Sequence, residues 1–205
     1  MGNKLPSPIP SYETALLQLN KIEIEHIQKT FKLIGKSEKH ITQQSFSSCE
    51  LIKCSMYVRK YILPRLFHVI DTKRDGLLDI EEYISAIALF RIGSTEEKIM
   101  LLFLMYEPQK NGFLLSDNLR QMLVDATIVI QKNEPVDYKD KKNHLDQLEH
   151  WIHEQLEIST CMTEMALQQF AQQQGKITLS EFVSYVKVEG SIQQLLNKLP
   201  QLIDN

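Results

Sequence analysis

The most constraining feature of this 205-residue chain is a regular pattern of acids between Asp71 and Glu82, in the stretch DTKRDGLLDIEE. Carboxylates stand at its first, fifth, ninth and twelfth places, and Gly76 stands at the sixth. A glycine there permits a sharp turn that a Cβ atom would resist. Oxygen donors at places 1, 3, 5, 7, 9 and 12 of a loop between two helices are typical of a calcium site. The pattern therefore predicts a helix–loop–helix unit centred on this stretch.

The oxygen donors of this loop would come from five residues: the carboxylates of Asp71, Asp75, Asp79 and Glu82, and the backbone carbonyl of Leu77. The third place is occupied by Lys73, whose ammonium has no lone pair to donate. Lys73 can avoid the charge of a bound ion by pointing outward and leaving a water as ligand, and calcium should then bind at about 10 µM or more weakly. Magnesium would compete, because it keeps several waters in any case. The alternative is a degenerate loop that is retained only for packing.

Composition and charge are those of an ordinary globular protein, with 43% hydrophobic and 24% charged residues. A net charge of -3 argues against a nucleic-acid surface. The three cysteines form no CxxC pair, which favours reduced thiols in a cytoplasmic protein. No apolar run approaches the roughly 18 residues of a membrane span, and no signal peptide is evident.

The N-terminus, MGNKLPS, would expose Gly2 after removal of Met1, as N-myristoylation requires. The motif requires Ser or Thr at residue 6, where this chain has Pro6, so acylation of Gly2 is the less favoured alternative. A single acyl chain would give only weak, peripheral contact with a membrane. Prolines at 6, 8 and 10 make residues 1–11 an expected flexible arm.

Three further loops repeat the pattern with poor ligands. Residues 34–45 place Ile41 at the eighth position, and residues 107–118 place Gly112 at the sixth, 36 residues after Gly76. Residues 170–181 place Gly175 at the sixth position and Ile177 at the eighth. Because these loops lack most of the acids, we expect no metal in the first and fourth, and very weak or no metal binding in the third, which lacks a Glu at its twelfth place. The apolar eighth residues should pair two loops across short strands.

We therefore expect an all-α fold of four helix–loop–helix units in two pairs, with short loop–loop β pairing. The expected organisation is a first pair at 12–93, a second pair at 94–190 with a surface insertion at about 131–143, and a C-terminal helix and tail at 191–205. One helix is expected from about Gln43 to Tyr61, and Pro64 should open the next.

These units resemble the calcineurin B and neuronal calcium sensor branch of the EF-hand superfamily, over roughly residues 20–200. The likeness is strongest from Phe67 to Leu123. The phrase GSTEEKIMLLF also looks like calaxin, an EF-hand subunit of axonemal dynein docking. A Gly2 start before degenerate loops resembles the N-terminal module of some TLDc-domain proteins. Such relatives usually carry two or three competent calcium loops, whereas this chain offers one.

The resemblance implies a calcium sensor that is not an enzyme and that binds an amphipathic helix of a partner protein. The sequence contains no nucleophile motif, phosphate-binding loop or carboxylate pair placed for catalysis. The alternative is a calcium-independent structural adaptor of an axonemal, cytoskeletal or membrane-associated assembly, or the N-terminal module of a larger protein. The helix from Ser191 to Leu199 would lie on the chain's own apolar surface and be displaced by a partner, or would lead into a further domain. His150 and His153, one helical turn apart, are expected to be exposed surface residues.

Overall fold

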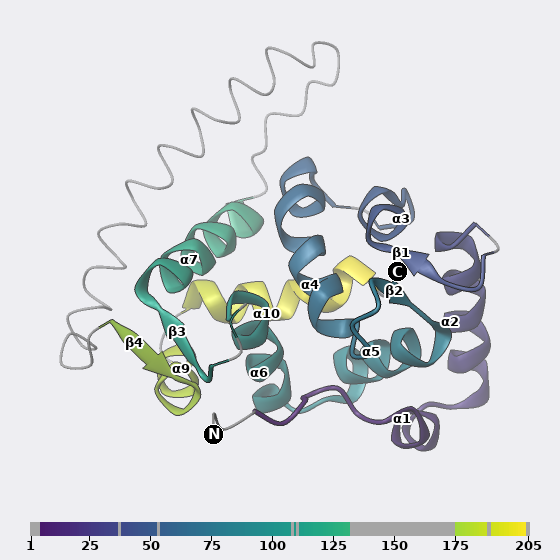
Figure 1. The fold of residues 1–205 in the computed structure, drawn as a ribbon, viewed down its shortest axis with the longest axis horizontal. Helices are drawn as coiled ribbons and strands as arrows, with labels where there is room; N and C mark the ends of the chain where they lie inside the picture. Colours follow the sequence, from purple (N-terminus) through teal and green to yellow (C-terminus); the bar gives the residue numbers. More distant parts are fainter. Residues whose placement is uncertain are drawn as a thin grey trace, which may run out of the picture.

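The computed structural model describes residues 5–36, 38–52, 54–107, 109, 111–131, 175–187 and 190–203. It is mostly helical, with two small pairs of antiparallel strands, which confirms the predicted all-α class (Figure 1). The predictions for Gly2, His150, His153 and most of the 131–143 insertion lie outside these residues, as do the first five places of the fourth loop. Within the described ranges, no helix combines the length and the hydropathy needed to cross a lipid bilayer.

In chain order the helices and strands are α1 (Tyr12–Gln18), α2 (Lys21–Ile34), β1 (Ile41–Thr42), α3 (Gln43–Ser48), the π-helix η1 (Val58–Ile62), α4 (Leu63–Ile70), β2 (Leu77–Leu78), α5 (Ile80–Ile92), α6 (Thr95–Tyr106), β3 (Phe113–Leu115), α7 (Ser116–Gln131), β4 (Lys176–Thr178), α9 (Leu179–Val186) and α10 (Gly190–Ile203). Local sequence explains many of the starts. Asn20, Asp79, Ser94 and Thr178 each cap a helix reciprocally with a glutamate three residues on.

The loops pair through short antiparallel strands, as predicted. In the first sheet Ile41 of β1 lies opposite Leu78 of β2, and in the second Leu114 of β3 lies opposite Ile177 of β4. All four side chains are fully buried. These are the eighth places of the four loops, so the internal repeat correctly predicted both the partners and the register.

The predicted helix from Gln43 to Tyr61 is wrong, because α3 ends at Ser48. The segment that follows is fastened by Arg59, whose guanidinium donates hydrogen bonds to the carbonyls of Ser47 (3.1 Å), Cys49 (2.7 Å) and Ile52 (2.7 Å). A side chain from the next helix thus satisfies carbonyls that a continuing helix would have used. Pro64 stands in the first turn of α4, as predicted, and the wide turns of η1 precede it.

Helix α5 is buried along most of its length and packs on α1, α2, α4, α6 and α10. Tyr83 on α5 packs its ring against Phe31 of α2 at a centroid distance of 5.6 Å. Arg91, near the other end of α5, forms an ion pair of 3.1 Å with Glu23 of α2. Since α5 follows directly from the loop that starts at Asp71, that loop is anchored on a helix with nine buried residues.

Residues 5–10 of the N-terminal arm have no regular secondary structure, and Pro8 and Ile9 are buried against the core. Ser11 then caps α1 by accepting a hydrogen bond from the backbone N–H of Thr14.

Helix α10 crosses the middle of the molecule and packs on α7 and also on α5, α6 and α9 (Figure 1). Its apolar side chains Ile192, Leu195, Leu196 and Leu199 are buried. Lys198 ties its far half to α7 by donating a 2.6 Å hydrogen bond to the carbonyl of Val129. The C-terminal helix therefore lies on the chain's own apolar surface, as the first predicted alternative requires, and its displacement by a partner stays a prediction. The surface that α10 covers on these four helices is named the α10 seat.

Candidate metal centre

The loop of residues 71–82 runs from the end of α4 to the start of α5. Two residues with positive φ, Arg74 (60°) and Gly76 (80°), reverse the chain within it. Asp71 is 6% exposed, and its carboxylate accepts hydrogen bonds from the backbone N–H groups of Asp75 (3.3 Å) and Gly76 (2.9 Å). The first acid of the loop therefore holds the turn together.

Glu82, at the twelfth place, is 4% exposed and has donors on both carboxylate oxygens. Its Oε1 accepts from the backbone N–H of Lys73 (2.8 Å) and from Thr72 Oγ1 (3.0 Å), and its Oε2 accepts from the N–H of Asp79 (3.2 Å). Asp79 in turn accepts the N–H groups of Glu81 and Glu82 at 3.0 Å each. Glu82 thus fastens the start of α5 to the third residue of the loop.

Lys73 does not point away from the loop in this structure. Its ammonium donates a short hydrogen bond to Asp79 Oδ2 and lies 3.5 Å from Glu81 Oε2. The long apolar stem allows the charged end to fold back onto the acids at the ninth and eleventh places. The hydrogen bond to Asp79 raises the pKa of Lys73. Burial acts to raise the pKa of Asp79, but the hydrogen bond from Lys73 and the N–H of Glu82 outweigh it and leave that pKa lowered.

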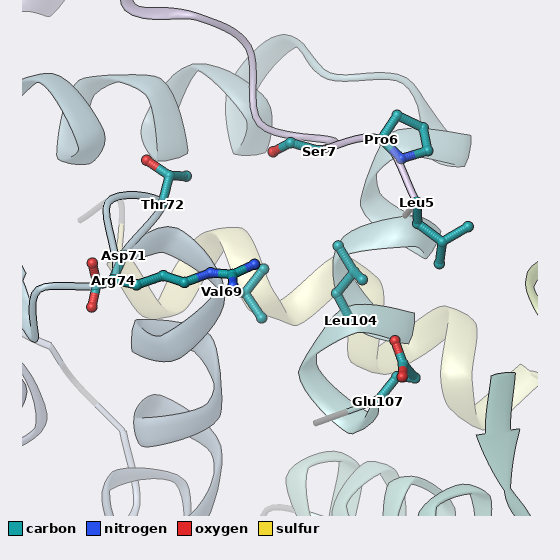
Figure 2. Close-up of a pocket in the computed structure, with 9 residues that line it drawn as sticks. All are labelled: Leu5, Pro6, Ser7, Val69, Asp71, Thr72, Arg74, Leu104 and Glu107. Carbon is teal, nitrogen blue, oxygen red and sulfur yellow. The ribbon is translucent and has the colours of Figure 1, made fainter. Parts of the chain in front are cut away.

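A cavity of about 460 Å³ lies beside the start of the loop (Figure 2). Figure 2 shows Arg74 reaching along it towards Val69 and Leu104, with the N-terminal arm on the far side. Asp71 and Glu107, the first residues of the second and third loops, both line it. Glu107 is buried, and its Oε1 accepts a hydrogen bond from the N–H of Asn111 at 2.5 Å. The two loops thus use their first acid in the same way, to hold their own backbone.

Comparisons with known proteins agree with this arrangement. No family model matches the sequence. The chain is 33% identical to a recoverin family protein of Dictyostelium discoideum over 90 residues, which cover 41% of this chain and 40% of that protein. It is 28% identical to calcineurin B type 2 of Bos taurus over 150 residues, 63% of this chain and 82% of that protein. It is 33% identical to calaxin of Danio rerio over 64 residues, 31% of this chain and 30% of that protein.

This chain resembles proteins of the EF-hand superfamily. Within it, the chain is similar to the calcineurin B and neuronal calcium sensor proteins, as the four loops and their pairing predicted. The chain spans less than half the length of the recoverin family protein and of the calaxin that it matches.

Three of the four EF-hand loops share one backbone turn. Gly76, Gly112 and Gly175, each at a sixth place, have φ of 80°, 88° and 72°. In the first loop the positive φ instead falls at Lys36, its third place. The first EF-hand therefore has its strand and its helices but lacks the glycine turn that the other three loops share.

The loop of residues 71–82 has the donor chemistry of a calcium site but not a ready-made cage. Carboxylate oxygens suit a hard cation such as calcium. In the part of the chain that the structure describes, however, no three His, Cys, Asp or Glu side chains are gathered so as to hold a metal. The oxygens of Asp71, Asp79 and Glu82 are turned to N–H groups and to an ammonium. The arrangement does not fit a calcium ion unless Lys73 leaves Asp79 and Glu82 releases the backbone of Lys73.

Sequence reasoning missed a second cluster, built around Asp125 on α7. This aspartate is fully buried. It accepts hydrogen bonds from Tyr57 Oη (2.6 Å), Arg65 Nη1 (2.5 Å), Tyr106 Oη (2.5 Å) and Gln121 Nε2 (2.7 Å). The sequence did contain a signal for this cluster, namely a single acid inside the apolar run QMLVDATIVI. An acid is seldom buried among apolar residues unless it has hydrogen-bonding or ionic partners.

Proposed function

We propose that this chain is a non-enzymatic EF-hand regulatory module that binds an amphipathic helix of a partner protein. Calcium at residues 71–82, supplied with ligands by Asp71, Asp75, Leu77, Asp79 and Glu82, would regulate that binding. The single observation that carries the proposal is α10 itself, an amphipathic helix of this chain that is packed on four others.

The α10 seat has the properties of a helix-binding surface. Ile192, Leu195, Leu196 and Leu199 recur at helical spacing and are buried, while Gln194 on the opposite face is exposed. Helix-in-groove recognition uses this arrangement of anchors, at positions three and four residues apart. A partner helix with the same pattern would replace α10 there. The tethered helix competes at a high effective concentration, so the partner must bind well or α10 must be loosened.

Calcium would act through the angle between α4 and α5, the helices on either side of the loop. Because Lys73 occupies the third place, the site should be single and weak, and magnesium should compete for it. Helix α5 follows this loop directly and packs on α10, so a movement of the loop can be transmitted through α5 to the α10 seat.

A labelled peptide of residues 190–203 tests the helix-binding part. The full chain carrying Leu195→Asp and Leu199→Asp, which weaken the attached α10, should bind the peptide, as measured by fluorescence anisotropy. The unaltered chain should bind it at least about tenfold more weakly, because its own helix competes. Gln194→Asp changes an exposed position of the same helix and should behave like the unaltered chain. Failure of the double variant to bind the peptide would contradict the proposed helix-binding surface.

The second candidate is a calcium-independent adaptor, and the contacts of Lys73 with Asp79 and Glu82 favour it, because the loop is held together by its own groups. Such an adaptor could serve an axonemal or membrane-associated assembly, or form the N-terminal module of a larger protein; acylation of Gly2 would add peripheral membrane contact. It predicts that Asp71→Ala and Glu82→Gln leave partner binding intact, measured with and without calcium.

A further inference from the structure

We infer that Lys73 serves as the built-in cation of the loop of residues 71–82, and that its release from Asp79 sets the affinity of the loop for calcium. The inference rests on the proposed calcium role of this loop and adds the residue that limits it.

Lys73 contacts two of the acids that a calcium ion would need. Its ammonium is bound to Asp79 at the ninth place, and its backbone N–H donates to Glu82 at the twelfth, over 2.8 Å. The same ammonium lies 3.5 Å from Glu81. A divalent cation would have to replace Lys73 as the partner of both Asp79 and Glu82. It would also be repelled at close range by the positive charge of the Lys73 ammonium.

The charge balance of the loop supports this role. The twelve residues contain five acids, with Glu81 counted, against the two cations Lys73 and Arg74. Of these two cations, Lys73 contacts the acids of the ninth and eleventh places. Loss of its charge would leave five acids against one cation and would free Asp79 to bind an ion.

The loop backbone does not depend on the ammonium. Asp71 holds the turn through the N–H groups of Asp75 and Gly76. The strand pairing of Leu78 with Ile41 fixes the second half of the loop, just before α5. The Lys73 side chain is 49% exposed and lines an open cavity of about 830 Å³ together with Lys32 and Lys39. Substitution of Lys73 therefore removes a charge without emptying the core.

Two variants distinguish the effect of the Lys73 charge on calcium affinity from the effect of lacking an oxygen ligand at the third place. Lys73→Met removes the ammonium and supplies no oxygen, whereas Lys73→Asn removes it and offers an amide oxygen at the third place. Calcium titration by calorimetry on the full chain should show Lys73→Asn binding at least about tenfold more tightly than the unaltered chain, with Lys73→Met between the two. Lys39→Asn makes the same charge change at another lysine of the cavity and should match the unaltered chain.

The location of the calcium site is checked by combining Glu82→Gln with Lys73→Asn. The combined variant should lose the increase in calcium affinity that Lys73→Asn alone produces. Equal affinities of Lys73→Asn and the unaltered chain, or no heat from either at millimolar calcium, would overturn the inference. A gain that survives Glu82→Gln would overturn it too, because the ion would then lie elsewhere. None of these results depends on the peptide experiment, so loss of the helix-binding proposal and loss of this inference are distinguishable.

Discussion

Arg65 on α4 and Asp125 on α7 form an ion pair of 2.5 Å that joins the two pairs of EF-hands. Helix α4 enters the loop of residues 71–82, and α7 leaves the third loop. Asp125 is wholly buried, and the Arg65 guanidinium also lies over the ring of Tyr106, 4.6 Å from its centroid. A movement of α4 must therefore either carry α7 with it or break this contact.

Removal of the Asp125 charge should destabilise the whole fold. Asp125→Asn leaves the guanidinium of Arg65 without its ionic partner, and because that guanidinium is 30% exposed, the loss should cost about 2 kcal/mol. Urea unfolding should show this loss as a lower midpoint with an unchanged slope. Asp117→Asn, at an exposed position of the same helix, should change the stability by less than about 0.5 kcal/mol. Equal urea midpoints for the two variants would show that the Asp125 cluster does not hold the two pairs of EF-hands together.

Stability should fall at alkaline pH because of the tyrosines in this cluster. Burial, and then the charge of Asp125, raises the pKa of Tyr57, and the same two causes raise the pKa of Tyr106. Both pKa values in the folded chain thus exceed the unfolded value of about 10, so their contribution is complete below about pH 10 and is lost as the pH rises further. The free energy of unfolding should drop by up to about 1.4 kcal/mol per pH unit for each tyrosine. Urea midpoints at a series of pH values should decline less steeply in Tyr57→Phe; an identical decline would contradict this assignment.

Alanine at two of the sixth-place glycines should have unequal costs. Both Gly76 and Gly175 have positive φ, which disfavours any Cβ by about 1–2 kcal/mol. A Cβ on Gly76 would meet no atom within 4 Å, whereas one on Gly175 would lie 2.6 Å from Ser116 Oγ. Ser116 Oγ also donates a hydrogen bond to the Gly175 carbonyl. Thermal unfolding should therefore show Gly175→Ala to be the less stable by about 1 kcal/mol; the reverse order would be incompatible with the described turn.

Arg59→Met should loosen one segment and leave the rest of the fold intact. The substitution removes three hydrogen bonds to carbonyls between Ser47 and Ile52, worth about 2 kcal/mol together. Hydrogen exchange should accelerate in residues 47–57, while the amides of α5 keep their protection. Uniform acceleration across both regions would mean that Arg59 supports the global fold instead.

The sequence predicted the loops well because their signals are local. Ile41, Leu78, Leu114 and Ile177 could be paired in advance, since a fixed place in a repeated loop determines the register. Contacts between residues far apart in the chain were not accessible in this way. The break after Ser48 depends on Arg59 in the next helical segment, and the partners of Asp125 come from helices up to 68 residues away.

Within the candidate site, too, side-chain contacts could not be predicted from the sequence pattern. The pattern identified Asp71, Asp75, Leu77, Asp79 and Glu82 as candidate ligands, and their role remains a prediction. The contacts of Lys73 with the carboxylates of Asp79 and Glu81 were not predicted, because the ligand pattern does not specify how side chains pair within the loop. When a loop contains both charges, the ion pair within the chain must be weighed before the site is assigned to a metal.

The central claim is that the loop of residues 71–82 controls the α10 seat, and hydrogen exchange of the α10 amides tests it most directly. Exchange should be compared with and without millimolar calcium, in the unaltered chain and in Glu82→Gln. The account predicts that calcium accelerates exchange in α10 of the unaltered chain and has no effect in Glu82→Gln. Identical exchange of α10 with and without calcium in the unaltered chain would contradict it and would leave the calcium-independent adaptor.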